Sequence, residues 1–264
     1  MNFFEAVILG LIQGFTEFLP VSSSGHLVIA HSLFSNVNEP GLLFDTLLHF
    51  ATLCAVVIYF RKKITKLIVS FFGIVIPSKK VDYYENKNYI WGIVVASIPT
   101  ALIGLTLKDY VETVFRLPSY VGYALILTSV LLLASDKVKN NNLKIDNVSS
   151  FLIGIVQGLA VIPGISRSGS TIATALFLGI KRETAAEFSF LISLPAILGA
   201  TMLQIKDIQD FDMTMLPIYL TGMAVAFISG IISIGIMMKI VKIAKLRYFA
   251  LYCLIVGIIS ILWL

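Results

Sequence analysis

The sequence predicts an all-α integral membrane protein with six transmembrane helices and two re-entrant helical hairpins, arranged as an inverted-topology repeat. Composition is the first reason: the 264 residues are 58% hydrophobic and 13% charged, against about 25% charged residues in ordinary soluble domains. Mean hydropathy is +0.92. The other two reasons are the lengths of the apolar runs and a polar segment that occurs twice. One membrane domain is expected over residues 1–264.

Six apolar runs have the length of about 20 residues that a helix needs to cross a bilayer. They cover about 43–60, 88–107, 119–135, 186–204, 215–238 and 247–263. Four runs are shorter and are separated within each pair by Pro, Gly and Ser, namely 3–18 with 23–34 and 150–162 with 170–180. Non-helical backbone at membrane depth persists only where protein or a water-filled cavity satisfies its polar groups. Each short pair is therefore expected to be a buried re-entrant hairpin.

One further apolar segment, residues 64–76, is short and follows a cluster of basic residues. We interpret it as an amphipathic helix at the membrane interface, and not as a seventh span.

The duplicated polar segment reads QGFTEFLPVSSSGH at 13–26 and QGLAVIPGISRSGS at 157–170. The likeness continues at the same offset of 144 residues, where FDTLLHFATLCAVV at 44–57 falls opposite FSFLISLPAILGAT at 188–201. We expect repeat 1 at about 1–137 and repeat 2 at about 148–264. Each repeat then has an odd number of crossings, which inverts the second repeat relative to the first.

Loop charge predicts the orientation. Lys and Arg concentrate in the connections 61–87, 136–148 and 238–247, which are therefore expected on the cytoplasmic side, with both termini outside. The net charge of +5 reflects these loops. It gives no indication of nucleic-acid binding, because no basic patch with interleaved aromatic residues is present. On this topology the two hairpins enter from opposite sides and their tips meet within the membrane.

The hairpin tips carry the residue types that bind phosphate. Each second hairpin helix is expected to begin at a group of hydroxyl residues, whose free backbone N–H groups lie at the positive end of the helix. Arg167 adds a fork of donors that matches phosphate oxygens. The predicted phosphate-binding residues are Ser22, Ser24, Gly25, Ser166, Arg167, Ser168, Gly169 and Thr171.

Glu17 does not suit a pure anion site. A divalent cation with oxygen ligands, magnesium or calcium, would reconcile its carboxylate with phosphate. Ser23 and His26 are three residues apart on one helix, so an imidazole there could activate a seryl oxygen or a water for attack on phosphorus. The sequence leaves open which of the two is the nucleophile.

Structural interpretations compete with these. Glu17 and Arg167 could form a buried ion pair, although ionisable groups at membrane depth are usually functional. The hydroxyl residues could cap helices, and the glycines could serve close packing. Asp45 and His49 lie four residues apart on the first full span. Three interpretations are open for them: they extend the site, line its mouth or form a structural pair. His31 is expected to pack at the interface.

The segments EFLPVSSSGH and PGISRSGST, with FSFLISLPAILGA, resemble the undecaprenyl-diphosphate phosphatase family, the bacitracin-resistance type of lipid diphosphatase. The resemblance covers essentially the whole chain. It implies a multi-pass phosphoric anhydride hydrolase of the bacterial plasma membrane that removes the terminal phosphate of undecaprenyl diphosphate. The monophosphate carrier serves peptidoglycan synthesis and cell-wall biogenesis. The resemblance also implies divalent-metal dependence, lowered bacitracin sensitivity and phosphate release at the outer face.

The resemblance assigns catalytic roles to Glu17 as metal or catalytic carboxylate, Ser23 as nucleophile and His26 as acid/base, and it makes Arg167 a phosphate holder with Ser166 and Thr171. Gln13 stands where many members have a second acid, which puts a two-carboxylate metal site in doubt. Its carbonyl oxygen remains a candidate ligand beside Glu17. The oligomeric state, including a homodimer, is left open.

Two other classes of protein share parts of this pattern. A transporter or flippase for the lipid carrier would also use inverted repeats around a midplane anion site, but it has no evident use for Glu17, Ser23 and His26 together. The phosphatidic-acid-phosphatase type shares the SGH triplet at 24–26. It is rejected because its Lys-x6-Arg-Pro signature is missing and no histidine follows Arg167.

Overall fold

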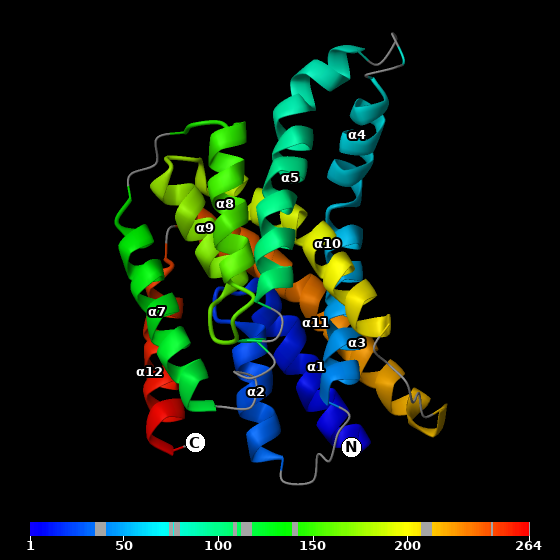
Figure 1. Cartoon of the computed structure of the whole chain (residues 1–264), viewed down its shortest axis with the longest axis vertical. Helices are drawn as coiled ribbons and strands as arrows, with labels where there is room; N and C mark the ends of the chain where they lie inside the picture. Colours follow the sequence, from blue (N-terminus) through cyan, green and yellow to red (C-terminus); the bar gives the residue numbers. More distant parts are fainter. Residues whose placement is uncertain are drawn as a thin grey trace.

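The structure is a computed structural model that describes residues 1–34, 41–73, 76, 80–107, 110–111, 118–138, 142–206, 213–243 and 245–263. Within these ranges the regular structure is helical, with one isolated bridge between Leu143 and Ile180. The α-helices are α1 (Phe3–Phe18), α2 (Ser23–Leu33), α3 (Gly41–Tyr59), α4 (Arg61–Phe72), α5 (Lys80–Thr106), α7 (Pro118–Asp136), α8 (Asn147–Leu159), α9 (Arg167–Phe177), α10 (Arg182–Lys206), α11 (Leu216–Lys242) and α12 (Arg247–Trp263). Figure 1 shows their arrangement.

Four of these helices are long and apolar enough to cross a membrane: α5, α7, α10 and α11. The bent pair α3 and α4 makes a fifth if it is counted as one span. Helix α12 is apolar over 17 residues. The expectation of an all-α integral membrane protein is thus confirmed, whereas the count of six spans stays a prediction.

The two short helix pairs expected from the sequence are present as α1 with α2 and α8 with α9. Both pairs begin with the same capping box, made by Asn2 with Glu5 and by Asp146 with Ser149. A capping box satisfies N–H groups that the first helical turn leaves unpaired. In Figure 1 the first pair lies in the lower part of the molecule, near both termini, and the second pair lies in the upper part.

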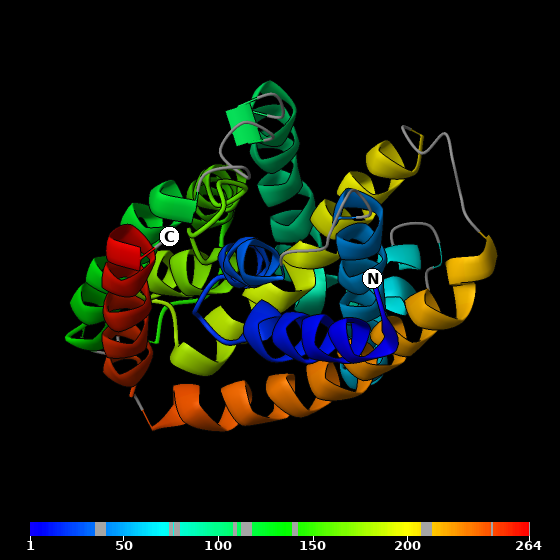
Figure 2. The ribbon, with the colours of Figure 1, turned by 90° about the horizontal axis from the view of Figure 1, so that it is seen from below.

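The outer helix of each pair packs along a long helix from the other half of the chain. Helix α1 runs along α11, as Figure 2 shows, and α8 runs along α5. Glycine permits both approaches: a Cβ on Gly14 would lie 2.6 Å from the Ala226 carbonyl oxygen, and one on Gly154 would lie 2.3 Å from that of Ala96. Each pair is therefore held against the other half of the sequence.

An aromatic core lies at the end of α1. Phe18, at the end of α1, meets Phe190 of α10 edge to face at 5.6 Å, and both rings are fully buried. Edge-to-face packing of this kind adds to the stabilisation that burial gives. The core fixes the end of α1, from which the first hairpin tip continues.

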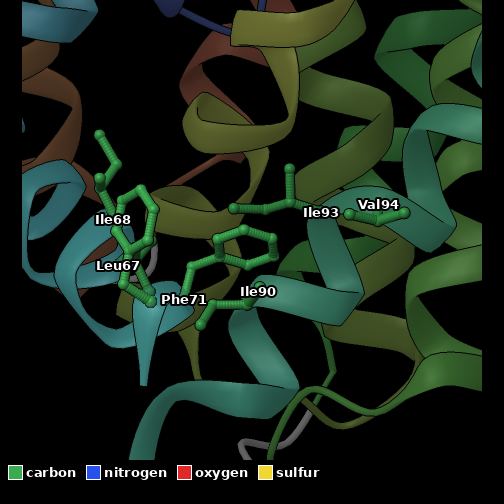
Figure 3. Close-up of a pocket in the computed structure, with 7 residues that line it drawn as sticks. Leu67, Ile68, Phe71, Ile90, Ile93 and Val94 are labelled. Atoms are coloured by element: carbon green, nitrogen blue, oxygen red, sulfur yellow. The ribbon is translucent and has the colours of Figure 1, made fainter. Parts of the chain in front are cut away.

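Helix α4 coincides with the expected amphipathic helix, but it begins at Arg61 and is bent by 77° from α3. It packs against α5, where Asn86 donates to the Ser70 hydroxyl at 3.1 Å. Figure 3 shows an apolar pocket between the two helices. Its lining residues are Leu67, Ile68, Phe71, Phe72, Ile90, Ile93 and Val94. The interfacial position of α4 stays a prediction.

Candidate functional site

The tips of the two helix pairs contact each other directly. The Gly164 N–H donates to the Ser22 hydroxyl at 3.1 Å, and the Ser168 hydroxyl donates to the Leu19 carbonyl at 3.1 Å. A Cβ on Gly25 would lie 3.0 Å from Gly164 Cα. The expected meeting of segments 144 residues apart is therefore observed, with backbone fitted against backbone.

Helices α2 and α9 begin in the same way. The Ser22 hydroxyl accepts from the Gly25 N–H at 3.3 Å, and the Ser166 hydroxyl accepts from the Gly169 N–H at 3.1 Å. The capping interpretation of these two serines is thus confirmed, and capping is compatible with phosphate binding. Ser22 does this at a φ of 69°, a conformation that costs about 1–3 kcal/mol in a non-glycine residue and is common at functional sites.

Glu17 is the centre of a buried polar cluster, with 4% of its side chain exposed. One carboxylate oxygen, Oε2, accepts from the Ser23 hydroxyl at 2.5 Å and from Gln13 Nε2 at 3.0 Å. The other, Oε1, accepts from the Arg167 guanidinium. The structure therefore brings together Glu17 and Gln13 of α1, Ser23 of α2 and Arg167 of α9, as the sequence predicted.

His49 of α3 joins this cluster. Its Nδ1 lies 3.3 Å from Glu17 Oε2 and 2.8 Å from Gln13 Nε2. Asp45, one turn earlier, instead meets His31 of α2, whose Nε2 is 3.0 Å from the carboxylate. The sequence left the pair of Asp45 and His49 open, and the structure divides it between two partners. The prediction of simple packing for His31 did not foresee its contact with Asp45.

His26 points away from this cluster. Its ring stacks on Tyr252 of α12 with centroids 5.5 Å apart, Nε2 lies 2.8 Å from the Tyr252 hydroxyl, and Nδ1 lies 2.8 Å from the Ser22 carbonyl oxygen. Ser23 donates to Glu17, so the shared helix face does not bring Ser23 and His26 into a hydrogen bond. The short seryl side chain reaches back to α1, whereas the longer imidazole reaches α12. Nothing in the sequence of the last span indicated Tyr252.

Of the remaining predicted phosphate holders, Ser24 lies in α2, with its hydroxyl 3.4 Å from that of Ser22, and Ser168 and Thr171 lie in α9. Thr171 donates to the Arg167 carbonyl at 2.8 Å and is 2.6 Å from the Ser189 hydroxyl, so it supports the helix that carries Arg167. Among the described residues, Arg167 Nη1, Gln13 Oε1 and Ser170 Oγ are buried without a hydrogen-bond partner. Buried polar atoms are usually paired. Within the described residues, Arg167 Nη1 can therefore donate to a polar ligand, and Gln13 Oε1 can accept from one.

The oxygen atoms of this cluster are candidate ligands for a divalent cation. Glu17 and the unpaired Gln13 Oε1 offer the hard oxygen atoms that magnesium and calcium prefer. Within the described part of the chain, no group of three or more His, Cys, Asp or Glu could hold a metal ion by itself. The residues fit a cation that takes its other ligands from substrate and water, as magnesium often does.

The helices and the buried cluster define an all-α integral membrane protein with a polar site where two helix tips meet. The chain belongs to the BacA family: the model for bacitracin resistance protein BacA matches residues 6–259. Three similar proteins are each named undecaprenyl-diphosphatase. The protein of Methanosphaera stadtmanae is 43% identical over 99% of this chain and 98% of its own length. Those of Syntrophotalea carbinolica and Treponema denticola are 40% and 44% identical, over 97% and 98% of this chain and 97% and 96% of their own lengths.

Proposed function

We propose that this chain is an undecaprenyl-diphosphate phosphatase, which hydrolyses undecaprenyl diphosphate to undecaprenyl phosphate and inorganic phosphate. Regeneration of the monophosphate would serve peptidoglycan synthesis and cell-wall biogenesis and would confer resistance to bacitracin. Family membership and the names of the relatives support the activity. The observation that carries it is the meeting of Ser23 and Arg167 on the carboxylate of Glu17.

Arg167 supplies charge for substrate binding. A terminal phosphate has more negative charge than the single carboxylate of Glu17 and presents two oxygens to a guanidinium fork, so it competes for Arg167. Nη1 of Arg167 is already an unpaired donor within the described residues. The N-termini of α2 and α9 add backbone N–H groups beside it. Binding the diphosphate therefore releases Glu17 from part of its ion pair.

Glu17 then acts as the proton acceptor. The Ser23 hydroxyl already donates to Glu17 Oε2, so the proton passes to the carboxylate as the seryl oxygen bonds to the terminal phosphorus and the bridging P–O bond breaks. Undecaprenyl phosphate leaves, taking its proton from His26 in the imidazolium form. Water then attacks the phosphoseryl phosphorus and gives a proton back to His26, while Glu17 returns its proton to the seryl oxygen as the P–O bond to Ser23 breaks. If water attacks directly, Glu17 accepts the proton of that water and Ser23 orients it.

A divalent cation, magnesium or calcium, belongs to this proposal with Glu17 and Gln13 as its protein ligands. When bound it would neutralise charge on the phosphate oxygens. The unpaired Gln13 Oε1 supports its place beside Glu17.

The finer topology is also proposed: six spans and two re-entrant hairpins, with repeat 1 at about 1–137 and repeat 2 at about 148–264. The reciprocal packing of α1 on α11 and of α8 on α5 supports an inverted repeat. Helix α4 begins with basic residues and lies in the upper part of Figure 1, whereas both termini lie in the lower part, which supports termini on the outside. The site would then open to the outer face of the plasma membrane through the first hairpin.

The proposal is tested with purified protein in detergent and undecaprenyl diphosphate as substrate. We expect phosphate release that stops with a chelator and returns with magnesium or calcium. Glu17→Ala and Arg167→Ala should abolish turnover with the fold retained, and full activity in either would refute the assignment. Trapping of labelled phosphate on wild-type protein, absent in Ser23→Ala, would identify serine as the nucleophile. Mass in the same detergent gives the oligomeric state, monomer or homodimer.

A flippase would need the anion site but not the hydrogen bond from Ser23 to Glu17. The relatives' names support the phosphatase and not the carrier. Lipid movement across vesicles without phosphate release would reverse this choice.

A further inference from the structure

The contact of His26 with Tyr252 follows neither from the sequence nor from the family name. His26 of α2 and Tyr252 of α12 are 226 residues apart, yet their rings lie 7° from parallel with centroids 5.5 Å apart. The Tyr252 hydroxyl is 2.8 Å from His26 Nε2. Stacking and a hydrogen bond together fix both the plane and the edge of the imidazole.

The partners of the two ring nitrogens define the tautomer. Nδ1 lies 2.8 Å from the Ser22 carbonyl oxygen, which can only accept a hydrogen bond. Nδ1 of His26 therefore carries the hydrogen. In the neutral ring Nε2 must then accept, and the Tyr252 hydroxyl is its donor. Nε2 is then the basic atom of the ring, and its lone pair accepts the hydrogen bond from Tyr252.

Ser22 ties this arrangement to the site. It caps α2 through its hydroxyl and accepts from His26 through its carbonyl, and the next residue, Ser23, donates to Glu17. The orientation of His26 is thus coupled to the backbone that places Ser23. Replacing a group that orients a histidine through its second nitrogen commonly lowers the activity that depends on that histidine.

We propose that Tyr252 is a positioning residue for His26: its ring sets the plane of the imidazole, and its hydroxyl keeps Nε2 oriented as the atom that exchanges protons. The role in turnover rests on the proposed phosphatase activity. The contact itself does not, so the two can be tested separately.

The direct test uses the small number of histidines. The chain contains three histidines, so protein labelled with ¹⁵N-histidine in detergent gives few signals. Spectra of His31→Asn and His49→Asn identify the signals of those two residues, and the two ring-nitrogen signals that remain belong to His26. At a pH where the ring is neutral, wild type should show His26 with hydrogen on Nδ1 and a hydrogen-bonded Nε2. Tyr252→Phe keeps the stacked ring and should move the Nε2 signal toward that of an unbonded nitrogen. Tyr252→Leu should in addition populate the second tautomer.

Tyr248→Phe is the matched control. It removes a hydroxyl one turn earlier on the same helix, from a side chain that is 59% exposed, and should leave the His26 signals unchanged. An unchanged Nε2 signal in Tyr252→Phe would overturn the proposal. So would a wild-type ring with its hydrogen on Nε2.

Kinetics test the role in turnover. Tyr252→Phe should lower kcat about 10-fold, a part of the factor that general acid–base catalysis supplies, with KM changed less than about twofold. Tyr248→Phe should match wild type. A shifted His26 signal with unchanged kcat would overturn the positioning role while leaving the phosphatase standing. Wild-type protein with no phosphatase activity would refute the proposed function, and the NMR signals would still decide whether Tyr252 holds His26.

Discussion

The two hairpin tips share a backbone design and differ in the side chains that the design presents. Ser22 and Ser166 cap the two inner helices in the same way. The first residue of each helix then diverges, because Ser23 begins α2 and Arg167 begins α9. Both side chains bind Glu17.

The position equivalent to Glu17 in the second tip is Val161, at the offset of 144 residues, and its side chain is 37% exposed. One tip therefore offers a proton acceptor and a hydroxyl, and the other offers a cation. The two tips thus share the same helix start and differ in the charged and nucleophilic side chains that they present.

The largest effect is expected where the tips differ in charge. Glu17→Gln keeps the shape of the side chain but removes the proton acceptor, and Arg167→Lys keeps the charge but removes the fork. Each should lower kcat/KM about 10³-fold in the phosphate-release assay. Val161→Ala changes the equivalent position of the second tip and should stay within about twofold of wild type. A comparable loss in Val161→Ala would show that the tips are not divided in this way.

A smaller effect is expected one helix away. His49 contacts Glu17 and Gln13, whereas its counterpart Ser193 donates to the Phe190 carbonyl at 2.7 Å. His49→Asn should therefore lower kcat about 10- to 100-fold, as the loss of groups that support a site commonly does. Ser193→Ala should leave kcat unchanged and affect thermal stability alone. Equal kinetic losses would place both residues in a structural role.

The two copies of the packing glycine should differ in stability. A Cβ on Gly14 would meet the backbone at 2.6 Å from Ala226 O and 2.9 Å from Gly230 N, whereas one on Gly158 would meet side-chain atoms of Ile103 at 2.8 Å and beyond. Side chains can move more easily than backbone. Gly14→Ala should lower the free energy of unfolding by about 3 kcal/mol and Gly158→Ala by about 1 kcal/mol. Thermal melts in detergent measure this, and a reversed order would contradict the packing.

The capping boxes should show the smallest effect, and it should depend on pH. Asn2→Ala and Asp146→Ala should each cost about 1 kcal/mol at neutral pH. Hydrogen bonds from the Ser149 side chain and backbone lower the pKa of Asp146 below its ordinary value. The ionised Asp146 cap therefore stabilises the fold fully above the unfolded-state pKa of about 3.9. This stabilisation is lost as pH falls through the lower folded-state pKa. Melts from neutral to acidic pH should show the Asp146→Ala deficit shrinking while that of Asn2→Ala persists.

The helices themselves were largely predictable. The run at 3–18 matches α1, and that at 247–263 matches α12, because apolar length and breaks at Pro, Gly and Ser are local signals. The second hairpin was predicted about three residues late, at 150–162 and 170–180, because the caps at Asp146 and Ser166 start its helices earlier.

The site was predictable only as far as the repeat carried it. Glu17, Ser23 and Arg167 could be placed together because the predicted inverted repeat brings the two tips into contact. The contacts of His49 with Glu17 and of His26 with Tyr252 depend on how α3 and α12 pack, and no periodicity in the sequence encodes that packing. The i to i+3 spacing suggested a pair of Ser23 and His26, but each side chain follows its own neighbour.

The central claim is that the two tips form one site through Glu17 and Arg167. The most direct measurement is kcat/KM for Glu17→Gln, Arg167→Lys and the double variant, each with its fold checked by thermal melting. Substitutions of residues that act as a unit have non-additive effects. We therefore expect kcat/KM of the double variant to lie no more than about threefold below that of the less active single variant. Losses that multiply in the double variant would mean that the tips act independently and would contradict the account.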